Sequence, residues 1–107
     1  MEVLHFVYPA GTSVRQAAQA GVVGSGNLEV LMEPSDAACA EVEVTTSQDG
    51  NREIWDCVLA RFFQEYPVCV RLEINDFGAT PGVVQLRLLQ VLDLAQEEAQ
   101  EKGGEAG

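Results

Sequence analysis

Hydrophobic and polar residues alternate with a period of two in four segments of this chain, which predicts β-strands. These segments are residues 3–8, 28–33, 39–46 and 68–74. The clearest is 39–46, where apolar residues alternate with Glu41 and Glu43 as in an antiparallel strand with one wet face. Residues 17–23 form a weaker strand candidate, because their alanines suit a helix equally well.

Two further segments have the three- and four-residue spacing of amphipathic helices. Residues 52–66 carry two apolar rows, made of Ile54, Val58 and Phe62 and of Trp55, Leu59 and Phe63. Asn51 or Asp49 is expected to cap this helix, and Pro67 ends it. The second helix spans residues 80–95, with the Thr80 hydroxyl as cap and Pro81 in the first turn.

The predicted order is therefore strand, strand, strand, strand, helix, strand, helix. Strands first and helices later indicate an α+β fold, a two-layer sandwich of a mostly antiparallel sheet with both helices on one face. We expect a loop over residues 75–79 between the last strand and the second helix. Residues 1–96 form the single predicted domain, and residues 97–107 form a flexible acidic C-terminal tail.

The charge balance excludes several classes of partner. Seventeen acidic and six scattered basic residues give a net charge of −11, so binding to nucleic acid or to an anionic membrane surface is not expected. No apolar run is long enough to span a bilayer, and the N-terminus does not resemble a signal peptide, so we expect a cytoplasmic protein. The three cysteines have no CxxC spacing, which argues against a zinc site.

The triplet Gly24-Ser25-Gly26 stands between two predicted strands and is therefore expected at a hairpin tip. It is either an ordinary turn or a place where a bulky reagent must reach the serine hydroxyl. A hydrolase is not favoured, because the GxSxG pattern is incomplete and His5 is the only histidine. Among the carboxylates, Glu73 and Asp76 are the two expected to be buried near a site.

Residue types also limit the kinds of carrier protein that this chain could be. Biotin and lipoate are attached to lysine, and the only lysine is Lys102 in the predicted tail. Helix-bundle acyl carriers use an Asp-Ser-Leu triplet, which is absent. A carrier built on this chain would use a serine in a loop, and Ser25 is better placed than Ser13, Ser35 or Ser47, which lack flanking glycines.

Three stretches of the chain, 21–31, 58–63 and 73–84, resemble the acyl carrier (delta) subunits of biotin-independent malonate decarboxylases. The most specific stretch is 73–84, which contains Asn75-Asp76-Phe77-Gly78-Ala79-Thr80-Pro81. The acyl carrier subunit of citrate lyase is a more distant relative with a different later loop. The resemblance thus favours malonate over citrate.

This resemblance implies that Ser25 carries 2′-(5″-phosphoribosyl)-3′-dephospho-coenzyme A through a phosphodiester, with Gly24 and Gly26 giving access. It implies a non-catalytic subunit whose arm carries acetyl and malonyl thioesters. The implied partners are the acyl transferase and decarboxylase subunits and a prosthetic-group transferase. Two alternatives stay open, a citrate-lyase-type carrier and an acidic docking module that is not modified.

Overall fold

The computed structural model describes residues 1–97 of the chain, so most of the predicted tail lies outside the described residues. The elements are β1 (Glu2–Pro9), β2 (Thr12–Ser13), β3 (Ala18–Gly21), β4 (Asn27–Pro34), β5 (Cys39–Thr46), α1 (Arg52–Glu65), β6 (Val68–Phe77) and α2 (Pro81–Gln96). Neither helix in this part of the chain is long and apolar enough to cross a membrane.

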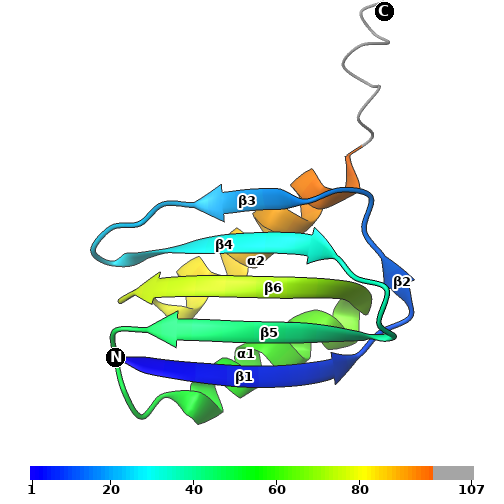
Figure 1. Ribbon diagram of the computed structural model, residues 1–107. Coiled ribbons are helices and arrows are strands. Elements are labelled where there is room, and N and C mark those ends of the chain that lie inside the picture. The colour runs from blue at the N-terminus through cyan, green and yellow to red at the C-terminus, as the bar shows by residue number, and fades with distance from the viewer. Residues whose placement is uncertain (98–107) are drawn as a thin grey trace, which may run out of the picture.

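The strands form one mixed sheet in the order β1-β5-β6-β4-β3, as Figure 1 shows. The pairs β1–β5, β4–β6 and β3–β4 are antiparallel. The pair β5–β6 is parallel, since the chain crosses through α1 between these strands, and the short β2 runs parallel to the start of β6. The prediction of an α+β sandwich with a mostly antiparallel sheet is confirmed.

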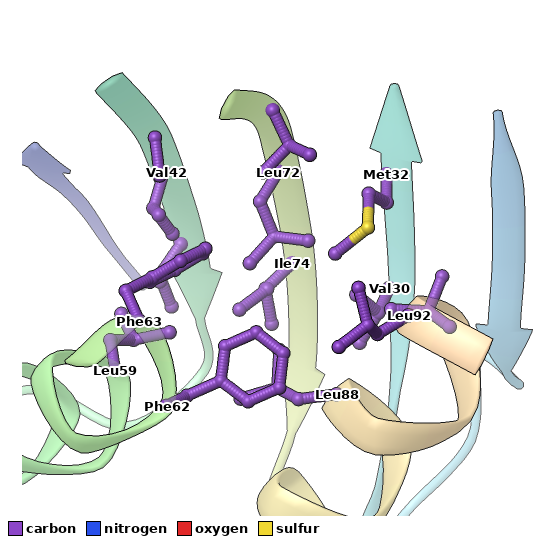
Figure 2. Packing of buried hydrophobic residues seen from close by; sticks show 14 of the residues in the cluster. Val30, Met32, Val42, Leu59, Phe62, Phe63, Leu72, Ile74, Leu88 and Leu92 are labelled. Atoms are coloured by element: carbon purple, nitrogen blue, oxygen red, sulfur yellow. The ribbon is translucent and has the colours of Figure 1, made fainter. Parts of the chain in front are cut away.

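Both helices cover the same face of the sheet (Figure 1), and the hydrophobic core fills the space between the two layers. Figure 2 shows Leu72 and Ile74 of the central strand β6 between side chains of β5 and β4, with Phe62 of α1 and Leu88 of α2 below them. Burying such a side chain contributes about 1.5–3 kcal/mol to the free energy of unfolding. The alternation along the strands is what places these side chains on one face.

The opposite face of the sheet is not covered by any described element, and it is strongly acidic. Cross-strand pairing aligns Glu41 with Arg71 and Glu43 with Glu73. The other carboxylates on this face are Glu29 and Glu33 of β4. The prediction that the carboxylates of residues 39–46 point away from the core is therefore confirmed.

Three details differ from the predictions. The strand expected to end at Ile74 continues to Phe77, because both neighbours offer partners there: Asp76 pairs with Leu28 of β4 and Thr46 of β5. The expected loop over residues 75–79 is correspondingly shorter. The two-residue strand β2 was not predicted, since two residues give no periodicity.

One of the two predicted helix caps forms and the other does not. Asn51 occupies the cap position of α1, but its side chain makes no capping hydrogen bond. The predicted cap of α2 is confirmed, because the Thr80 hydroxyl accepts a hydrogen bond from the Val83 N–H at 3.3 Å and Pro81 begins the helix. The start of α2, directly after β6, is thus fixed by its own sequence.

Tyr8 connects the edge strand β1 to α1. Its hydroxyl donates a 2.7 Å hydrogen bond to Asp56 Oδ1, and its ring stacks on Phe63 with the centroids 5.5 Å apart. Burial, together with the hydrogen bond to Asp56, raises the pKa of the Tyr8 hydroxyl well above its usual value. The folded state therefore holds this proton more tightly than the unfolded state, so the stabilisation is lost as the pH rises above about 10.

Replacing Tyr8 with phenylalanine is expected to lower the free energy of unfolding at neutral pH by about 1 kcal/mol, the value of one hydrogen bond. The variant should also lose less stability than the parent when the pH is raised above about 10. Urea unfolding at neutral and alkaline pH measures both effects. Tyr66→Phe is the matched control. The assignment to Tyr8 would be wrong if the Tyr8→Phe protein lost as much stability at alkaline pH as the parent does.

Candidate functional site

The triplet Gly24-Ser25-Gly26 lies at the tip of the β3–β4 hairpin, as predicted. The two strands pair antiparallel, from Ala18 opposite Met32 to Gly21 opposite Glu29. Residues 22–26 form the connecting loop. Figure 1 shows this loop projecting at the end of the sheet where β6 also ends.

Backbone hydrogen bonds hold the loop at both of its ends and against the end of β6. The Val22 N–H donates to the Leu28 carbonyl at 3.0 Å, and the Asn27 N–H donates to the Gly24 carbonyl at 3.1 Å. The Gly26 N–H donates to the Phe77 carbonyl at 2.7 Å. This last bond connects the serine loop to the stretch 73–84, so the end of β6 acts as a support for the loop.

Two glycines of the hairpin are required by its backbone. Gly21 has a φ of +85°, and a Cβ there would overlap the Leu28 carbonyl oxygen. Gly26 has a φ of +75° and open space around it. Both positions therefore need the left-handed region that glycine adopts without strain. A Cβ on Gly24 would meet nothing within 4 Å, so this residue is not needed for packing and leaves space beside the serine.

Ser25 itself is exposed, and its hydroxyl has no hydrogen-bond partner among residues 1–97. Residues 20–28 include no ionisable side chain. Val22 and Val23 beside it are 57% and 64% exposed, which is unusual for two adjacent valines. The hydroxyl is thus exposed on a loop whose own side chains carry no charge.

The only histidine lies far from this serine. His5 is on β1, at one edge of the sheet, whereas the serine hairpin forms the opposite edge. Three strand spacings separate β1 from β4, or about 14 Å, which is far beyond hydrogen-bond distance. His5 Nε2 lies 3.7 Å from Glu43 Oε2 on the exposed face of the sheet. A Ser25–His5 pair for nucleophilic catalysis therefore does not exist in this fold.

The two carboxylates predicted to be buried have different environments. Glu73 is exposed on the outer face of the sheet, so the prediction that it is buried is wrong. Buried and exposed side chains alternate along this part of β6, and residue 73 falls on the solvent-facing side. Asp76 is 5% exposed. Its Oδ2 accepts from the Thr46 hydroxyl at 2.8 Å and its Oδ1 from the Ala79 N–H at 2.9 Å. Asp76 thus joins β5 to the turn before α2.

Replacing Asp76 with alanine is expected to lower the free energy of unfolding by about 2–3 kcal/mol, because the buried Thr46 hydroxyl and the partly buried Ala79 N–H lose their acceptor. Asp76→Asn should cost much less, since its amide can accept from the Ala79 N–H and donate to the Thr46 hydroxyl. Urea unfolding compares the variants. If Asp76→Asn folds normally but abolishes function, Asp76 is a reacting group and the structural assignment is wrong.

The support beneath the serine loop is the part of the site that residue patterns did not predict. A bridge pairs Asn27 with Gly78, and Gly78 has a φ of +96°. A Cβ on Gly78 would lie 3.8 Å from the Gly26 nitrogen. In the sequence, only the family resemblance drew attention to this region, because its most specific stretch includes Phe77 and Gly78.

Comparisons with known proteins agree with this geometry. The model of the malonate decarboxylase delta subunit family matches residues 15–95. The malonate decarboxylase acyl carrier protein of Azotobacter vinelandii is 50% identical over 94 residues, which are 87% of this chain and 95% of the relative. That of Pseudomonas paraeruginosa is 48% identical over 96 residues, covering 89% of this chain and 97% of the relative.

A solved structure is also similar. It is the crystal structure of a Pseudomonas malonate decarboxylase hetero-tetramer in complex with malonate, in which one chain superposes with a TM-score of 0.85 at 44% identity. The match covers 89% of this chain and 99% of that chain. The relatives thus support the malonate-type over the citrate-type carrier, and the chain belongs to the malonate decarboxylase delta subunit family.

Proposed function

We propose that this chain is the acyl carrier subunit of a malonate decarboxylase and that Ser25 bears its prosthetic arm, 2′-(5″-phosphoribosyl)-3′-dephospho-coenzyme A. The observation that carries the proposal is the exposed Ser25 hydroxyl at a glycine-flanked hairpin tip, in a chain of the delta subunit family. The open space around Gly24 and Gly26 fits a bulky phosphodiester at this position.

The chain needs no catalytic group of its own in this role. The arm, when bound and loaded, supplies a thioester carbonyl that can accept the electrons released by decarboxylation. The residues of this chain present the anchor, hold the hairpin rigid and leave the reacting end to other subunits.

The proposed partners are the acyl transferase and decarboxylase subunits of the complex, together with the prosthetic-group transferase that modifies Ser25. The related solved chain comes from a hetero-tetramer, which supports partner subunits. Tethering the acyl group raises its concentration at both active sites without any new contact. We place the assembly in the cytoplasm, as the sequence predicts.

Transfer of isotopically labelled malonate tests the acyl-carrying role. The purified complex, containing this chain in its loaded form, is given labelled malonate while decarboxylation is stopped by an inactive decarboxylase subunit. The label is expected on this chain and should be released by neutral hydroxylamine, as a thioester is. Label that stays on the other subunits, with none on this chain, would contradict the proposal.

A further inference from the structure

A groove of about 330 Å³ opens where β6 ends, between the first turns of α1 and α2 and the residues that follow β6. This volume is at the lower end of the range found for small-molecule sites. Its apolar wall is formed by Ile54, Trp55, Val58 and Val84. Ile54 is 51% exposed, although the helix pattern predicted it in an apolar row.

The rim of the groove is polar but carries no positive charge. Its side-chain amides are those of Gln48 and Asn51, and the Asn51 amide donates to Gln48 Oε1 at 3.4 Å. The single carboxylate that lines the groove, Asp76, is already bound by Thr46 and Ala79. With no lysine or arginine in its lining, the groove suits a neutral, flat ring with a polar edge better than a phosphate.

The groove is continuous with the support of the serine loop. Gly78 lines the groove, and a Cβ on it would lie 3.8 Å both from the Gly26 nitrogen and from Gln48 Nε2. Ser25 is therefore one residue away from Gly26, whose N–H bonds to the Phe77 carbonyl next to Gly78, a residue that lines the groove. A tethered ring would be present at high effective concentration there, so a weak site suffices.

We propose that this groove binds the adenine base of the arm carried on Ser25, an inference that rests on the proposed function. The adenine is a neutral flat ring, and side-chain amides pair with its edge, as asparagine and glutamine do in adenine recognition. Ile54 and Val58 supply apolar contact for its faces. Docking the base near the anchor leaves the thiol end of the arm free to move between active sites.

The experiment uses carrier whose loading on Ser25 has first been verified by intact mass. Backbone amide shifts are compared between the loaded and unmodified proteins, together with the fluorescence of Trp55, the only tryptophan. Loading is expected to shift amides of residues 48–55 and 78–80 in addition to those of the hairpin, and to change the Trp55 emission. Shifts confined to residues 22–27 would overturn the inference.

A matched pair of variants separates docking from general effects. Ile54→Ser in the groove and Leu86→Ser outside it alter two helical side chains of nearly equal exposure, 51% and 49%. Ile54→Ser is expected to reduce the ratio of docked to undocked base roughly fivefold, because apolar contact is lost, whereas Leu86→Ser should preserve the loaded spectrum. An equal change in the ratio of docked to undocked base in both variants would overturn the inference that this groove binds the base. A missing mass increase on Ser25 would instead be a failure of the proposed function.

Discussion

Replacing Ser25 with alanine is expected to lower the rate of malonate decarboxylation by the assembled complex about a thousandfold or more, because no tethered thioester can form. The stability of the chain should not change, since the Ser25 side chain is exposed and bonds to no described residue. Decarboxylation is measured as carbon dioxide released from malonate, and stability as urea unfolding of the isolated variant.

Ser47→Ala is the matched control for this substitution. Ser47 also lies exposed in a loop at the same end of the sheet, and its backbone N–H bonds to the Asp76 carbonyl without involving its side chain. The control complex should decarboxylate malonate at the parental rate. An active Ser25→Ala complex would show that the carrier thioester is not attached to Ser25.

Gly21→Ala is expected to destabilise the protein by roughly 2–4 kcal/mol, the largest effect of any single methyl group added to the hairpin. A left-handed alanine costs about 1–3 kcal/mol, and moving the backbone away from the added Cβ costs a similar amount. The Cβ would overlap the Leu28 carbonyl, which accepts the Val22 hydrogen bond that closes the hairpin. Urea unfolding measures the loss.

Gly24→Ala provides the comparison within the same loop. Its Cβ would meet nothing within 4 Å and its φ is not positive, so stability should stay within about 0.5 kcal/mol of the parent. The rate at which the prosthetic-group transferase loads Gly24→Ala then measures how far this glycine gives access to Ser25. Equal destabilisation by both alanines would contradict the account of the hairpin.

Much of this architecture could be predicted from the sequence because one face of the sheet is wet. Each strand with a buried and an exposed face shows the alternation directly, as residues 39–46 do. The hairpin and its Gly-Ser-Gly tip followed from the alternation of residues 28–33, the weaker strand candidate before them and a short glycine-rich connection. Thr80 and Pro81 marked the start of α2, since the cap is a local interaction.

What could not be predicted depends on contacts between distant segments. Asp76 looks like a turn residue until Thr46 and Ala79 are placed beside it. The support of the serine loop by Phe77 joins residues about fifty positions apart, so no local pattern contains it. The exposure of Ile54 was missed for the same reason, because the groove exists only where both helices approach the end of β6.

Attachment of the arm to Ser25 is tested by the intact mass of this chain, isolated from the native complex, followed by peptide mapping. We expect an added mass equal to that of the phosphoribosyl dephospho-coenzyme A arm, located on the peptide that contains Ser25. An unmodified mass in a complex that still decarboxylates malonate would contradict it. The chain would then be an acidic docking module whose glycine-flanked serine is only a turn.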